Sequence, residues 1–74
     1  MSKDTNIVNT RKIESIMILE DLTQRDLAAE LGIAPQTVNA KLRRRKGFNL
    51  VEVYKIANLF GVTVDELLIP IEDS

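Results

Sequence analysis

The sequence predicts a compact all-α domain built from five helices. Apolar residues recur at spacings of three and four along most of the chain, as they do on one face of an α-helix. Residues that favour helix starts or helix ends flank each of these apolar stretches. No alternation of apolar and polar residues is long enough to predict a strand. Agreement between periodicity and capping signals favours one helical fold for the chain of 74 residues.

The first helix is expected at residues 9–19, where Ile13, Ile16 and Met17 form an apolar stripe. The preceding residues 1–8 are mostly polar, and we expect them to form a flexible arm.

The second and third helices are expected at residues 24–31 and 35–44. Thr23 and Asp26, three residues apart, have the spacing of a capping box. Gly32 stands where a helix commonly ends in a left-handed conformation. The boundary signals therefore agree with the apolar spacing.

Only a short turn separates these two helices, so we expect them to cross steeply, as in a helix-turn-helix. Ala28 is small enough for the next helix to pass close to it, and Ile33 fills the turn. Pro35 suits the first helical turn, while Val38 and Leu42 anchor the helix to the core.

The fourth helix is expected at residues 50–60, between Asn49 as N-cap and Gly61 as stop signal. The fifth is short and is expected at residues 64–68, with Thr63 as its cap. The inward face of the fourth helix is expected to carry five apolar residues: Leu50, Val53, Ile56, Ala57 and Phe60.

Charge is unevenly distributed although the net charge is only −1. Residues 33–46 include five basic residues and no acid, whereas residues 64–74 include four acids and no base. A basic segment attracts phosphates even when the rest of the surface is acidic. We therefore expect a folded domain at residues 9–69 with a basic face, followed by an acidic tail at residues 70–74.

Several classes of function are disfavoured by composition. The chain has no His and no Cys, so thiol nucleophiles, disulfides and the usual zinc ligands are missing. Its three glycines stand singly, which excludes a glycine-rich phosphate loop. We expect no enzyme, no metal, no cofactor and no small-molecule substrate. No apolar run approaches the ~18 residues of a membrane span, and residues 1–10 lack a signal peptide, so we expect a cytoplasmic protein.

Two runs together resemble the Cro and lambdoid-repressor-type (Xre-like) regulators. The first is LTQRDLAAELGIAPQTVN at residues 22–39, and the second is VYKIANLFGVTVDELL at residues 53–68. The resemblance spans about residues 13–68. It implies a lambda-repressor-like domain that binds double-stranded DNA and regulates transcription, with repression expected. Many members carry a Glu-x-Gly turn after the recognition helix, where this chain has the more basic LRRRKGF at residues 42–48.

In such a fold the second helix of the motif enters the major groove. At about 100° per residue, Gln36, Ala40 and Arg43 point away from its buried side. Gln36 suits a bidentate contact with adenine, and Arg43 a contact with guanine or phosphate. The expected DNA contacts are Gln24 (a phosphate contact, by resemblance), Gln36, Thr37, Asn39, Ala40, Lys41, Arg43, Arg44, Arg45 and Lys46.

Several of these residues also have a purely structural interpretation. Gln24 and Gln36 also suit ordinary first-turn positions, and residues 43–46 also suit a solvated helix end that complements the helix dipole. Lys3, Arg11 and Lys12 are weaker candidates for phosphate contact.

The apolar run at residues 67–71 exceeds what one small core is expected to bury. We expect a homodimer that uses Leu67, Leu68, Ile69 and Ile71. The alternative is that Leu67 and Ile71 fold back onto the first helix. The alternative function is a protein-interaction module of the same fold, such as an antitoxin partner, which the slightly acidic net charge favours.

Overall fold

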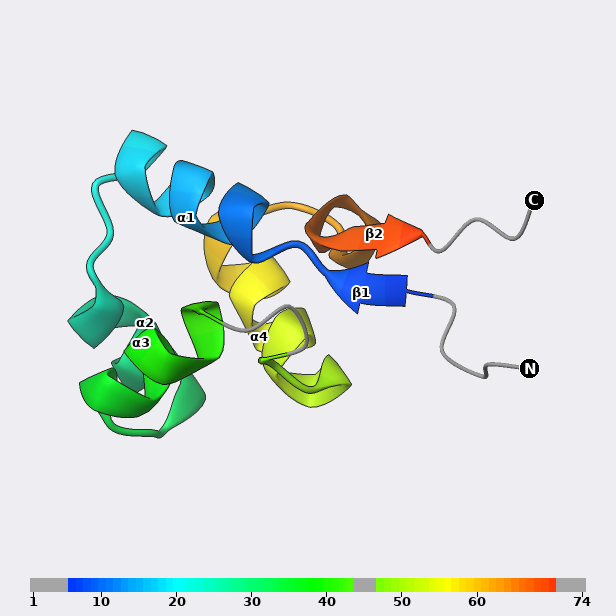
Figure 1. Cartoon of the computed structure of the whole chain (residues 1–74). Coiled ribbons are helices and arrows are strands. Elements are labelled where there is room, and N and C mark those ends of the chain that lie inside the picture. Colours follow the sequence, from blue (N-terminus) through cyan, green and yellow to red (C-terminus); the bar gives the residue numbers. More distant parts are fainter. Residues whose placement is uncertain (1–5, 44–46, 71–74) are drawn as a thin grey trace.

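The computed structural model describes residues 6–43 and 47–70 of the chain. Within these residues, four α-helices and a 3-10 helix pack together, and two short strands pair with each other (Figure 1). The elements in order are β1 (Asn6–Val8), α1 (Thr10–Leu19), α2 (Gln24–Leu31), α3 (Pro35–Leu42), α4 (Leu50–Phe60), η1 (Val64–Leu67) and β2 (Leu68–Pro70).

The fold is all-α, as the sequence predicts, but it also contains two short strands that we did not expect. β1 pairs with β2 in antiparallel register, with Val8 opposite Leu68. Just after β1, the backbone N–H of Asn9 donates to the Leu67 carbonyl at 2.8 Å. Residues 6–8 thus form a strand where we expected a flexible arm. Each strand has three residues, too few for an alternating pattern, and its partner comes from the other end of the chain.

The fifth expected helix is not an α-helix. Val64–Leu67 forms a 3-10 turn, and the chain is already extended at Leu68 (φ −119°, ψ 149°). The N–H of Thr63 donates to the Glu66 carboxylate at 3.3 Å, which is the glutamate half of the expected capping box. The α-helical pattern does not develop because Leu68 enters the strand instead.

Helices α2 and α4 have the predicted boundaries. Helix α1 begins one residue later than predicted, because Asn9 is its N-cap and accepts the Lys12 N–H at 3.0 Å. Helix α3 is two residues shorter than predicted, since Arg43 is its C-cap.

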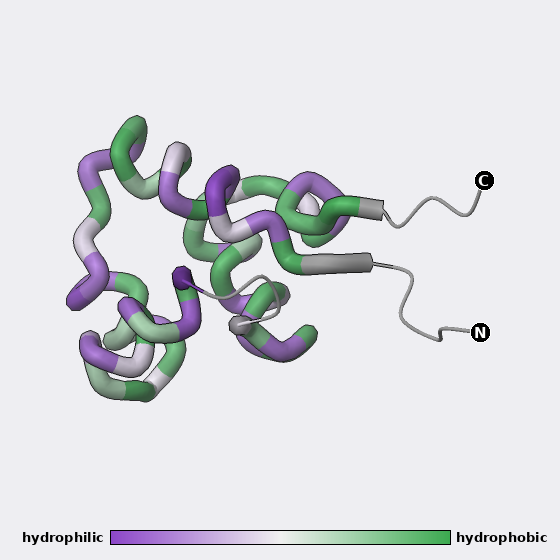
Figure 2. The backbone as a smooth tube through the Cα atoms, in the orientation of Figure 1, coloured by the Kyte–Doolittle hydropathy of each residue, from purple (hydrophilic) through white to green (hydrophobic). Residues whose placement is uncertain are grey.

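Apolar side chains from the helices, η1 and β1 form one core. Figure 2 shows that every helix carries both hydrophobic and hydrophilic positions. The buried residues are Val8, Ile13, Met17, Leu27, Ala28, Leu31, Val38, Leu42, Phe48, Val53, Ile56, Ala57 and Leu67.

Leu50 does not face this core as expected. It is the first residue of α4, and 68% of its surface is exposed. Phe48, just before the helix, is buried in the core instead.

Candidate nucleic-acid interface

The turn between α2 and α3 fixes how one helix leaves the other. Gly32 ends α2 with φ +72°, a conformation that other residues rarely adopt. The N–H groups of Gly32 and Ile33 both donate to the Ala28 carbonyl, at 2.8 and 3.1 Å. Ala34 is extended (φ −75°, ψ 148°) and leads into Pro35, the first residue of α3. These local bonds set the start of α3 relative to α2.

Helix α3 has one buried face and one exposed face, as its sequence predicts. Val38 and Leu42 are buried in the core. On the other side, Gln36, Ala40 and Arg43 are exposed. Thr37 is exposed beside them. The helix therefore presents its polar side chains to a partner while its apolar pair holds it in place.

A polar cleft of about 550 Å³ lies between α1, α2 and α3. It contains three expected DNA-contact residues, Gln24, Asn39 and Arg43. Within it, Arg43 Nε donates to Asn39 Oδ1 at 3.2 Å. Arg11 of α1 lines the same cleft, although its position in sequence does not reveal that it lies near α3.

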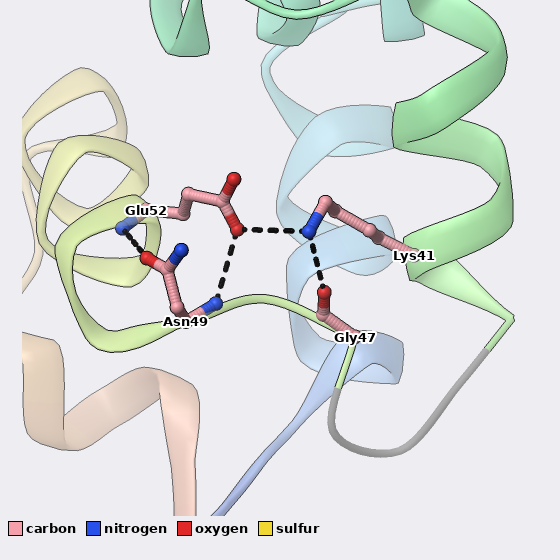
Figure 3. Close-up of polar contacts among 4 residues, drawn as sticks. All are labelled: Lys41, Gly47, Asn49 and Glu52. Carbon is pink, nitrogen blue, oxygen red and sulfur yellow. Dashed lines mark hydrogen bonds and ion pairs between the residues drawn. The ribbon is translucent and has the colours of Figure 1, made fainter.

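Lys41, an expected DNA-backbone contact, has two partners within its own chain. Its Nζ lies 3.2 Å from Glu52 Oε1 on α4 and donates to the Gly47 carbonyl at 3.1 Å (Figure 3). The two side chains of this ion pair are only 26% and 14% exposed. The Lys41 ammonium is therefore engaged inside the protein, where it ties α3 to the start of α4.

Glu52 serves this contact and caps its own helix. It accepts the Asn49 N–H at 3.0 Å, while its own N–H donates to the Asn49 side-chain oxygen at 2.8 Å. This capping box is visible in Figure 3 next to the Lys41 ammonium. The partner of Lys41 is thus held by local hydrogen bonds in addition to the ion pair.

Gly47 passes very close to the end of α3. A Cβ atom at this position would collide with the Lys41 carbonyl group and would lie 2.8 Å from the Lys41 Cα. The sequence places Gly47 shortly after the third expected helix but does not reveal this close approach. The close approach depends on the fold of the following segment.

The N-terminus of α2, where Gln24 is half-buried, is reinforced by the capping box of Thr23 and Asp26. The Thr23 N–H donates to the Asp26 carboxylate at 2.9 Å, and the Thr23 hydroxyl does so at 3.1 Å. These hydrogen bonds hold the pKa of Asp26 below its ordinary value of 3.8.

The expected dimer residues do not share one exposed surface. Leu67 is fully buried in the core of its own chain, which leaves it no surface for a partner. Leu68 is half-buried, and Ile69 is 40% exposed. Arg44, Arg45, Lys46 and Ile71 lie outside the described residues.

No helix in residues 6–43 and 47–70 is long and apolar enough to cross a membrane. The same residues contain no group of three or more side chains suited to a metal ion.

Comparison with known proteins agrees with the architecture. A family model described as a Cro/C1-type HTH DNA-binding domain matches residues 12–73. The chain is also 36% identical over 62 residues to an uncharacterized HTH-type transcriptional regulator of Methanocaldococcus jannaschii. That alignment covers 84% of this chain and 94% of the relative. No solved structure gives a significant match.

Proposed function

The chain belongs to the family of Cro/C1-type helix-turn-helix DNA-binding domains, and we propose that it is a sequence-specific transcriptional repressor whose helix α3 enters the major groove. The observation that carries this proposal is the two-faced α3. Val38 and Leu42 hold it in the core, and its exposed face offers Gln36, Thr37 and Arg43. The major groove of B-DNA is wide enough for an α-helix, and its base edges carry a distinct pattern for each base pair.

The exposed residues of α3 suit different contacts. Gln36, in the first turn, matches the donor and acceptor of adenine. The methyl groups of Thr37 and Ala40 suit the methyl group of thymine. Arg43 suits guanine or a phosphate, with Asn39 orienting its guanidinium through the hydrogen bond to Nε.

We also propose contacts with the phosphate backbone of the DNA. Gln24, at the first position of α2, is placed to bind a phosphate together with the positive end of the helix dipole. The basic residues 44–46 are proposed to bind further phosphates because long cationic side chains suit that role. Lys41 leaves the proposed set because its ammonium binds Glu52 and Gly47.

A fluorescence-anisotropy titration of labelled duplex DNA tests this function. Operator sequences are first selected from a random pool with the wild-type protein. Gln36→Ala should then weaken binding by about 1–3 kcal/mol and relax the preference at one base position. Asn58→Ala, an exposed change on α4, is the matched control and should bind like wild type. Absence of duplex binding at low salt, or equal binding by the two variants, contradicts the proposal.

We also propose that the protein binds DNA as a homodimer, because one module makes few base contacts and two half-sites multiply them. Exposed apolar side chains are available on α4, where Leu50 is 68%, Val51 64% and Tyr54 59% exposed. Ile69 on β2 offers a second, smaller apolar position. Sedimentation of Leu50→Asp and Ile69→Asp at several concentrations would locate the interface. A wild-type protein that stays monomeric on its operator contradicts the dimer.

The alternative function, a protein-interaction module, draws on the same exposed side chains of α4. It predicts a stable complex with another protein and no dependence of any binding on Gln36. Repression itself is tested with a reporter gene behind the selected operator, whose expression should fall when the wild-type protein is produced.

A further inference from the structure

We propose that the polar cleft between α1, α2 and α3 holds a phosphodiester of the DNA backbone, and that Arg11 is a principal cation in it. The inference rests on the proposed function and adds a contact outside the helix-turn-helix itself. Arg11 belongs to α1, before the two helices of the motif.

The cleft has the size and lining for an anion. Its volume of about 550 Å³ leaves room for a phosphate group with several waters, since a water takes about 30 Å³. The residues that line it are Thr10, Arg11, Glu14, Gln24, Asn39, Leu42 and Arg43. All but Leu42 are polar or charged, so the cleft offers donors rather than an apolar floor.

The charges in the cleft favour an anion. Arg11 and Arg43 contribute two positive charges and Glu14 one negative charge, which leaves a net charge of +1. A guanidinium has five N–H donors in a planar fork that matches phosphate oxygens. The hydrogen bond to Asn39 uses Nε of Arg43, so its terminal amino groups carry the remaining donors. Gln24 adds the N-terminal end of α2, where backbone N–H groups attract an anion.

The position of the cleft explains why this anion would belong to DNA. Asn39 lies on a flank of α3 and Arg43, its C-cap, on the exposed face, and both side chains line the cleft. When a helix lies in the major groove, about 12 Å wide, the phosphate strands run along both of its sides. A cleft that opens beside α3 therefore meets one of these strands, and α1 reaches that strand through Arg11.

Replacement of Arg11 gives the direct test. In anisotropy titrations across several salt concentrations, Arg11→Ala should weaken binding to operator DNA and to mixed-sequence DNA by the same factor. The slope of log affinity against log salt should become shallower by about 0.9, the value for one phosphate contact. Lys55→Ala is the control, because it removes one positive charge from an exposed position of α4 that does not line the cleft. This control should leave the slope unchanged. Arg11→Lys keeps the positive charge, so its slope should be close to that of the wild-type protein.

A second variant, Glu14→Gln, should change DNA affinity in the opposite direction to Arg11→Ala. Glu14→Gln removes the negative charge from the cleft and should tighten DNA binding. Glu30→Gln makes the same change at an exposed position of α2 outside the cleft, and should have a smaller effect.

The outcomes separate this inference from the proposed function. A wild-type protein that fails to bind duplex DNA overturns the proposed function. Binding that depends on Gln36, with equal slopes for Arg11→Ala and Lys55→Ala, overturns the cleft assignment alone. Side-chain NMR signals of Arg11 that respond to inorganic phosphate, with DNA affinity indifferent to Arg11, would place a free anion there and also overturn it.

Discussion

At the scale of single residues, Gly47 matters because the chain passes too close to α3 for a side chain. We expect Gly47→Ala to destabilise the fold by more than about 1 kcal/mol, since the new Cβ would meet the Lys41 backbone. The midpoint of urea unfolding measures this. Ser15→Ala, an exposed change on α1, serves as control. A midpoint for Gly47→Ala equal to that of the control would show that the segment moves aside freely.

Lys41, in the last turn of α3, illustrates how a basic residue can stabilise the fold. Lys41→Met and Glu52→Gln should each lower stability, with a coupling of up to about 1 kcal/mol in a double-mutant cycle, because the pair is partly exposed. Lys55→Met, an exposed change on α4, controls for loss of charge.

The same variants distinguish an internal contact from a DNA contact. We expect the salt dependence of DNA binding to be unchanged in Lys41→Met. A slope shallower by about 0.9 in Lys41→Met but not in Glu52→Gln would return Lys41 to the phosphate-binding residues.

At the scale of elements, α2 shows how local bonds place a functional helix. The capping box holds the pKa of Asp26 below 3.8, so the carboxylate contributes stability above pH 3.8 that is lost as the pH falls through the lowered pKa. We expect wild type to be more stable than Asp26→Asn at neutral pH. The difference should shrink below pH 3.8, as measured by thermal unfolding at several pH values.

Thr23→Val tests the cause of that pH dependence. It removes the hydroxyl that donates to Asp26 but keeps the backbone N–H. The acid-sensitive part of the stability should therefore become smaller without disappearing. A Thr23→Val profile identical to wild type would mean that the hydroxyl does not lower the pKa of Asp26.

At the scale of the whole molecule, Leu67 joins the end of the chain to the core. We expect Leu67→Ala to destabilise the fold by about 2–5 kcal/mol, the usual range for a buried leucine. Ile69→Ala should have a smaller effect, because its side chain is 40% exposed. The free energies of unfolding of the two variants are compared by chemical unfolding at two protein concentrations. A loss of stability in Leu67→Ala that depends on concentration would indicate an interface role instead.

The sequence by itself determined helices α1 to α4, the caps of α2 and α4, and the two faces of α3. Thr23 with Asp26, Asn49 with Glu52, and Gly32 act on neighbours a few residues away, so their effects follow from spacing. The core face set by Val38 and Leu42 follows from helical periodicity in the same way.

Only the tertiary structure decided the pairing of β1 with β2, the burial of Leu67, the partner of Lys41 and the place of Arg11 beside α3. Each depends on segments that meet in space although they are separated along the chain. Three-residue strands leave no pattern, and a lysine in a basic run looks the same whether it faces a phosphate or Glu52. Burial and contact between distant elements distinguish these cases, because they decide which charges and apolar groups lose their water.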